Sequence, residues 1–313
     1  MIEARNLTKR YGDRLAVDDL SFIVKPGIVT GFLGPNGAGK STTMRMIVGL
    51  DRPTSGSVTV NGKPLSEHLR PLAEVGVLLE ARAIHSGRTA RNHLLAMAAT
   101  GGIGRRRVDE VIDLVGLNEV ADRRAGRFSL GMGQRLGIAS ALLADPDALI
   151  LDEPVNGLDP DGVRWIRNLL RDLAAEGRTV FLSSHLMSEM ALTADHVIVV
   201  GRGRLLRDQS MADFIADAGG NVVRVRSPQA RRLASILRSR GLDVRDVADG
   251  ALEIDGVSSD EIGLAAATEH LTVLELAAKS ASLEEAYMAL TDDQVEYRSI
   301  SRINEDETDK VAA

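Results

Sequence analysis

The glycine-rich stretch from Gly34 to Ser41 constrains the fold of this chain more than any other feature of the sequence. Two glycines separated by four residues are followed by Lys and Ser, and the stretch lies between an apolar run, residues 29–33, and a helix-forming segment. In such a pattern, backbone N–H groups curl around phosphate oxygens, and the start of the following helix adds the positive end of its dipole. We therefore expect an α/β domain that contains a strand, a phosphate-binding loop and a helix in this order.

The side chains of this loop have separate expected tasks. Lys40 reaches the β and γ phosphates of a nucleotide, Ser41 ligates magnesium, and Thr42 adds a further phosphate contact. The nucleotide-binding residues predicted in this stretch are Gly34, Asn36, Gly37, Ala38, Gly39, Lys40, Ser41 and Thr42.

A second motif, the pair Asp152 and Glu153, indicates what the nucleotide is used for. The pair follows an apolar run, residues 148–151, which is expected to be a strand. Asp152 is then expected near the metal, and Glu153 near the γ phosphate, where a carboxylate can orient or deprotonate an attacking water. Because nucleotide binding alone does not need the second acid, the pair predicts hydrolysis.

Composition narrows the class of protein. The 313-residue chain contains no Cys, which excludes disulfides, thiolate catalysis and Cys-ligated metal sites and fits a reducing compartment. Its formal net charge of -6 argues against a protein that coats nucleic acid through bulk charge. No secretory signal is evident, and the longest apolar runs are far shorter than the roughly 20 residues of a spanning helix. We therefore expect a soluble intracellular chain whose membrane role, if any, depends on a partner.

The pattern of apolar residues predicts two domains and a tail. Residues 2–207 alternate β-branched runs with amphipathic stretches, which is typical of an α/β domain. The clearest helix is predicted over residues 159–176, with Asp159 as its N-cap. Strands are predicted at residues 21–24, 29–33, 148–151, 180–183 and 196–200.

Beyond Gly219 and Gly220 the pattern changes. Residues 222–276 indicate strand, helix, strand, strand, helix and strand, which suggests a small ferredoxin-like α+β module. A final helix is predicted at 282–290, begun by a capping box of Ser282 and Glu285. The predicted domains are therefore residues 1–218 and 219–292, followed by a flexible acidic tail, residues 293–313.

Taken together, these motifs resemble those of the ATP-binding subunits of ABC transporters. Residues 128–132, followed by Gln134, Arg135 and Leu136, are similar to the signature sequence of that family, with Leu130 and Met132 in place of its usual glycine and glutamine. The resemblance implies a P-loop NTPase fold with a helical subdomain at about residues 81–140, and ATP and Mg²⁺ as cofactors. It also implies that Ser129 and Gly131 contact the γ phosphate of a nucleotide held by a second protomer.

The resemblance extends to four further positions. Residues 156–159, which include Asp159 of the expected nucleotide site, look like the loop that crosses the dimer interface beside the carboxylate pair. His185 looks like the catalytic switch histidine, and Tyr11 occupies the position where the family stacks an aromatic ring on adenine. Glu80 replaces the glutamine that usually links magnesium to the membrane subunit. We therefore expect Ser41, Asp152 and Glu80 around the metal.

The partners implied by this family are a second ATP-binding protomer and a separate transmembrane permease, docked through the helical subdomain, with no nucleic acid. The chain would then lie on the inner face of the cell membrane. The C-terminal module and residues 290–298 look similar to drug-export ATPases of the daunorubicin and bacitracin resistance type. The sequence leaves open an importer, a nucleotide-dependent regulator without useful turnover, and a non-transport ABC ATPase that acts on ribosomes or nucleic acid.

Overall fold

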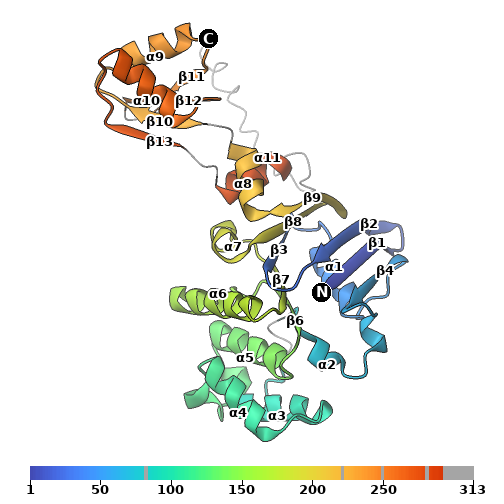
Figure 1. Ribbon diagram of the computed structural model, residues 1–313. Helices are drawn as coiled ribbons and strands as arrows, with labels where there is room; N and C mark the ends of the chain where they lie inside the picture. Colours follow the sequence, from blue (N-terminus) through green and yellow to red (C-terminus); the bar gives the residue numbers. More distant parts are fainter. Residues whose placement is uncertain (81–83, 220–221, 248–249, 279–281, 292–313) are drawn as a thin grey trace, which may run out of the picture.

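A six-stranded sheet forms the centre of the structure, a computed structural model that describes residues 1–80, 84–219, 222–247, 250–278 and 282–291 (Figure 1). The strand order is β5-β6-β7-β3-β8-β9, in which β9 alone is antiparallel to its neighbour. The strands are β3 (Val29–Leu33), β5 (Val75–Leu78), β6 (Ala148–Asp152), β7 (Thr179–Ser183), β8 (His196–Gly201) and β9 (Arg204–Ser210). The predicted strands from residue 29 to residue 200 are therefore confirmed within one or two residues.

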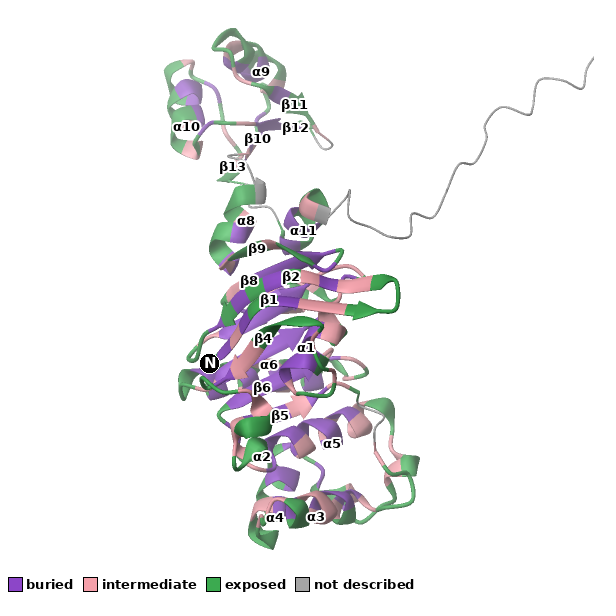
Figure 2. Cartoon of the chain, turned by 90° about the vertical axis from the view of Figure 1, so that its right-hand side faces the viewer, coloured by how far each residue is buried: buried purple, intermediate pink, exposed green. Residues whose placement is uncertain are grey.

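A second, antiparallel sheet packs on one face of the first. Its strand order is β2-β1-β4, with β1 (Ile2–Tyr11), β2 (Arg14–Val24) and β4 (Ser55–Val60). The predicted strand at 21–24 is the end of β2, so it belongs to this sheet and not to the central one. The phosphate-loop helix α1 (Lys40–Ile47) contributes Met44, Met46 and Ile47 to the core between the sheets. Figure 2 shows the buried residues concentrated in these strands.

Helices cover the opposite face and form a separate lobe. The predicted helix at 159–176 is confirmed as α6 (Pro160–Ala175), and Asp159 caps it by accepting a 2.8 Å hydrogen bond from the Gly162 N–H. The lobe consists of α3 (Ala90–Thr100), α4 (Arg105–Leu114) and α5 (Leu130–Leu142) (Figure 1). Before the C-terminal module the chain also forms α2 (Pro71–Glu74), α7 (Met187–Thr193), α8 (Met211–Gly219) and the 3₁₀ turns Leu65–Glu67, Asn118–Val120 and Ala125–Arg127.

The C-terminal module has its own core. Its antiparallel sheet has the order β11-β12-β10-β13, formed by β10 (Val223–Arg226), β11 (Val244–Asp246), β12 (Ala251–Ile254) and β13 (Glu275–Ala278). Helices α9 (Ala230–Ser239) and α10 (Ser259–Thr268) pack on one face of it. This is the element order that the sequence analysis assigns to residues 222–276.

The last helix, α11 (Leu283–Thr291), packs away from that module. Ser282 and Glu285 form the predicted capping box, with hydrogen bonds of 2.8 and 3.1 Å. However, α11 contacts α8 and α7, and its buried residues Leu283 and Ala286 belong to the core of the first domain. The chain therefore returns to the first domain after the module. The predicted tail at 293–313 lies outside the described residues, and no helix in the described part is long and apolar enough to cross a membrane.

Candidate functional site

Four parallel strands end at the same edge of the central sheet, and each has a predicted site residue at its end or within two residues beyond it. Gly34 follows β3, Glu80 lies two residues beyond β5, Asp152 ends β6 and His185 lies two residues beyond β7. The carboxyl edge of a parallel sheet is where α/β proteins bind ligands, because loops from neighbouring strands converge there. The sheet thus brings together residues that are more than 100 positions apart in the chain.

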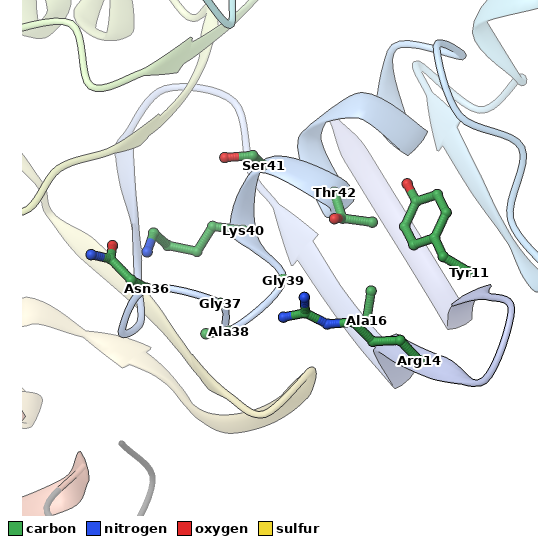
Figure 3. Close-up of a pocket in the computed structure, with 10 residues that line it drawn as sticks. All are labelled: Tyr11, Arg14, Ala16, Asn36, Gly37, Ala38, Gly39, Lys40, Ser41 and Thr42. Carbon is green, nitrogen blue, oxygen red and sulfur yellow. The ribbon is translucent and has the colours of Figure 1, made fainter. Parts of the chain in front are cut away.

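The phosphate loop lines a cavity of about 460 Å³ (Figure 3). Tyr11 contributes to its wall together with the loop residues 36–42. Arg14 and Ala16 also line it, although the sequence analysis did not single them out. Arg14 and Ala16 are the first and third residues of β2. Alternate residues of a strand face the same side, so this spacing is the sequence feature that could have identified them as neighbours in the cavity wall.

Lys40 is a half-buried cation in the wall of this cavity. Its Nζ donates hydrogen bonds of 2.6 and 3.3 Å to the carbonyl oxygens of Gly34 and Pro35. Burial lowers the pKa of the ammonium, and the carboxylates of Glu153 and Asp152 act in the opposite direction. The loop therefore holds a positive charge close to backbone carbonyls, which phosphate oxygens could replace as partners.

Two glycines of the loop are required by packing as well as by phosphate approach. Gly39 has φ +99°, and a Cβ on it would lie 2.5 Å from the Ala16 carbonyl oxygen of β2. A Cβ on Gly34 would lie 2.5 Å from the Val200 carbonyl oxygen of β8. Backbone carbonyls cannot rotate away as side chains can, so a Cβ at either position would force the backbone to shift. The sequence motif does not reveal these neighbours.

Asp152 lies between two hydroxyl groups. Ser41 Oγ donates a 2.8 Å hydrogen bond to Asp152 Oδ2, and Ser183 Oγ donates a short one to Asp152 Oδ1. Ser183 also accepts a 3.1 Å hydrogen bond from the Glu153 N–H. In the sequence, Ser183 is recognisable only as the last residue of the strand predicted at 180–183. It faces the carboxylates because it pairs in register with Asp152 across β6 and β7.

Glu153 and His185 are in direct contact. His185 Nδ1 lies 2.7 Å from Glu153 Oε2, and the His185 N–H donates to the same oxygen at 3.2 Å. Glu153 has φ +53°, a left-handed conformation that is uncommon outside glycine and often found at functional sites. The buried Gln134 of α5 donates a 3.1 Å hydrogen bond to the Glu153 carbonyl oxygen. Helix α5, which begins in the signature sequence and is called the signature helix below, thus supports the backbone of Glu153, the residue expected to activate water.

The signature residues lie outside the phosphate-loop cavity. Ser129 is exposed and caps α5 by accepting a 3.2 Å hydrogen bond from the Met132 N–H, and neither it nor Gly131 is among the residues that line that cavity. A Cβ on Gly131 would lie 2.7 Å from the Gly157 carbonyl oxygen, and one on Gly157 would lie 2.3 Å from Leu130 Cγ. The signature and the loop at residues 156–159 are therefore packed together.

The residues present suit a magnesium ion that is completed by phosphate oxygens. A hydroxyl and a carboxylate, from Ser41 and Asp152, already lie 2.8 Å apart, and Mg²⁺ prefers such oxygen ligands with few from the protein. Across the described residues, no three His, Cys, Asp or Glu side chains cluster closely enough to bind a metal by themselves. Glu80 is exposed at the neighbouring strand end.

Comparison with known proteins agrees with this geometry. Residues 17–156 match the family described as ABC transporter, and residues 221–284 match a domain of unknown function. The bacitracin transport ATP-binding protein BcrA of Bacillus licheniformis is 45% identical over 211 residues, which are 66% of this chain and 69% of that protein. The Nod factor export ATP-binding protein I of Burkholderia lata is 33% identical over 301 residues, covering 93% of this chain and 96% of that protein.

A solved structure shows the same fold. It is the dimeric post-hydrolysis state of the ATP-binding cassette MJ0796 bound to ADP and Pi, with a TM-score of 0.62 and 25% identity, and the match covers 67% of this chain and 99% of that one. The phosphate loop, the carboxylate pair and these relatives lead to one conclusion: the chain belongs to the family of ABC transporter ATP-binding subunits.

Proposed function

We propose that this chain is the ATP-hydrolysing subunit of an ABC exporter. The observation that carries the proposal is the continuous contact from Ser41 through Asp152 and Ser183 to Glu153 and His185, at the edge where the phosphate loop lies. Such an arrangement can hold a triphosphate at one end and direct a water molecule at the other.

Ser41 and Asp152 are the residues that would hold Mg²⁺. The ion would neutralise charge on the phosphate oxygens. Glu80 would add a carboxylate beside Asp152, because β5 and β6 are neighbours in the sheet. Lys40 would exchange its two carbonyl partners for the β and γ phosphates.

Glu153 is the group that would orient or deprotonate the attacking water. His185 would keep the Glu153 carboxylate in place through its two contacts with Oε2 and would lie near the γ phosphate. The unusual backbone conformation of Glu153 is stabilised by Ser183 and by Gln134, so the carboxylate is positioned before substrate binds.

The complete site is proposed to need two protomers. Ser129 and Gly131 lie outside the cavity that the phosphate loop lines, so they are suited to contact a nucleotide on a second copy. MJ0796 was solved as a dimer with 67% of this chain matched, which supports this arrangement. Closing around two nucleotides and reopening after hydrolysis would supply a conformational stroke.

Export through a separate permease is supported by the relatives. Their names describe bacitracin transport and Nod factor export, which favours transport over the alternative of an ATPase that acts on ribosomes or nucleic acid. We therefore assign a drug-like or other small molecule as cargo. The chain would be peripheral on the inner face of the cell membrane, held there by the permease.

Hydrolysis is tested with Glu153→Gln. The amide keeps the shape of the side chain but cannot accept a proton, so turnover should fall by about 10²- to 10⁴-fold while ATP still binds. Phosphate release and ATP affinity are measured on the purified chain with Mg²⁺. The matched control is Glu67→Gln, an exposed glutamate of the Leu65–Glu67 turn, which should leave turnover unchanged. Full hydrolysis by Glu153→Gln would refute the assignment of the base.

Direction is tested in membrane vesicles that contain the chain together with its permease partner. Inverted vesicles should accumulate a drug-like cargo when ATP is supplied outside, and the Glu153→Gln chain should not support this. ATP-driven uptake confined to right-side-out vesicles would contradict export.

A further inference from the structure

The Tyr11 hydroxyl contacts two side chains, Asp51 and Thr42, and the contact with Asp51 has the larger effect on it. It is the last residue of β1, 45% exposed, and its ring lines the cavity (Figure 3). Its hydroxyl donates a 2.7 Å hydrogen bond to Asp51 Oδ2, and this bond is the main cause that raises the pKa of the Tyr11 phenol. Asp51 itself does not line the cavity.

Asp51 is held firmly from the opposite side. Arg45 of α1 donates from Nε to Asp51 Oδ2 at 2.8 Å and from Nη2 to Oδ1 at 3.3 Å, a two-point contact that fixes the carboxylate plane. The Asp51 N–H also donates to the Arg45 carbonyl oxygen at 3.3 Å. Only 16% of the Asp51 side chain is exposed. The acceptor of the Tyr11 hydroxyl therefore moves with α1.

The same helix thus has two connections to the nucleotide cavity. Its first turn carries Lys40, Ser41 and Thr42, which line the phosphate end. Its last turn carries Arg45, which holds Asp51 and, through it, the Tyr11 ring. The distance between the phosphate end and the ring is therefore set by one rigid element.

One face of the Tyr11 ring is already in use. Lys9 Nζ lies 4.8 Å from the ring centroid and donates a 2.6 Å hydrogen bond to the Arg52 carbonyl oxygen. A flat ligand can stack only on the other face. Because Tyr11 ends a strand and is followed by a hairpin turn at Gly12, the ring would have several rotamers without the bond to Asp51.

We propose that Asp51 is a positioning residue for the nucleotide base: it fixes the Tyr11 ring at the distance from the phosphate loop that an adenine base requires. This inference rests on the proposed function, because it assumes that the cavity holds ATP. Asp51 acts through Tyr11 and contacts no substrate. Losing the bond leaves the ring to be ordered when the nucleotide binds, which weakens binding of the base by roughly threefold to tenfold.

The test separates the base from the phosphates. Binding of a non-hydrolysable ATP analogue with a β,γ-imido group, and of inorganic tripolyphosphate, is measured by calorimetry on the full chain. Asp51→Ala and Tyr11→Phe should each weaken analogue binding by about threefold to tenfold and leave tripolyphosphate binding unchanged. Asp51→Ala should have no further effect in the Tyr11→Phe chain, because the bond between the two side chains is already absent there. KM for ATP should rise while kcat stays constant.

Two further variants keep the proposal falsifiable. Asp51→Asn should recover most of the lost affinity, because its amide oxygen can still accept from the phenol. Asp255→Ala, which breaks the 2.7 Å contact with Arg245 in the C-terminal module, is the control for loss of an Asp–Arg pair and should change neither affinity.

Several results would overturn the proposal. They are unchanged analogue binding by Asp51→Ala, an equal loss of tripolyphosphate binding, an undiminished effect of Asp51→Ala in the Tyr11→Phe chain, or an Asp51→Asn chain that binds no better than Asp51→Ala. A wild-type chain that binds tripolyphosphate but shows no preference for the analogue would refute this inference alone. A wild-type chain that binds neither ligand would instead refute the proposed ATPase.

Discussion

Replacing Gly39 with Ala tests whether the phosphate loop is held by packing or only shaped for phosphate. Gly39 precedes α1 with φ +99°, and the new Cβ would lie 2.5 Å from the Ala16 carbonyl oxygen and 3.2 Å from Val17 Cγ2. Both neighbours belong to β2, which is fixed by its pairing with β1. The variant should therefore lose stability even when no nucleotide is present.

The loss of folding free energy expected for Gly39→Ala has two contributions. A left-handed conformation costs a residue with a Cβ about 1–2 kcal/mol, and forcing an atom into a filled site costs a further 1–3 kcal/mol or so. Gly27→Ala is the matched control, because Gly27 has φ +83° and no atom lies within 4 Å of its expected Cβ. The control carries the first contribution only. Gly39→Ala should thus be about 1–3 kcal/mol less stable than Gly27→Ala.

The assay is thermal unfolding followed by circular dichroism in the absence of nucleotide. For a domain of this size, each kcal/mol lowers Tm by about 2–4 °C, so Gly39→Ala should unfold several degrees below the control. The change in the unfolded chain is the same Gly-to-Ala change in both variants, so it cancels in the comparison. Equal Tm values for the two variants, with nucleotide binding lost only in Gly39→Ala, would refute the packing argument.

Two further predictions concern Ser183 and His93. Ser183→Ala removes the hydroxyl that donates to Asp152 and accepts from the Glu153 N–H, so ATP turnover should fall by roughly tenfold or more. An unchanged rate of phosphate release by this variant would contradict the role of Ser183. His93 is 8% exposed, and burial lowers its pKa, so the unfolded chain takes up a proton that the folded chain resists. The contribution of His93 to stability should decline as pH falls below about 6.5, so Tm of the wild type should drop more than Tm of His93→Gln as pH is lowered through that range.

Much of the site could be predicted because its signals are local. The phosphate loop and the pair Asp152 and Glu153 each combine a short motif with an adjacent apolar strand, and the parallel sheet then brings their ends to one edge. Asp159 is a similar case, since an N-cap is defined by the residues just after it. Each of these features depends on the backbone geometry of only a few consecutive residues, so a short stretch of sequence is enough to predict it.

The contacts that were missed join segments with no local relation. Tyr11 and Asp51 are 40 positions apart, and Asp51 looks like any acidic residue in the loop after a helix. The packing of α11 against α8 depends on where the chain returns after the module, which periodicity alone does not indicate. The glycine neighbours belong to the same class, because Ala16 and Val200 reach the loop only after both sheets have formed.

The departure at Leu130 occurs where two parts of the proposed dimer site meet. A Cβ on Gly157 would lie 2.3 Å from Leu130 Cγ, and a Cβ on the next residue, Gly131, would lie 2.7 Å from the Gly157 carbonyl oxygen. Further along the same helix, Gln134 holds the carbonyl of Glu153.

The signature helix is therefore in contact with both the loop at residues 156–159 and the backbone of the proposed base. If Ser129 and Gly131 bind the nucleotide of the second protomer, a shift of α5 on binding must also move Glu153, which serves the nucleotide of its own protomer. Contiguous packing of this kind is a physical route for coupling two sites, provided that the helix has two arrangements. Leu130 places a large side chain at the start of this series of contacts, at the position where the signature sequence usually has a glycine.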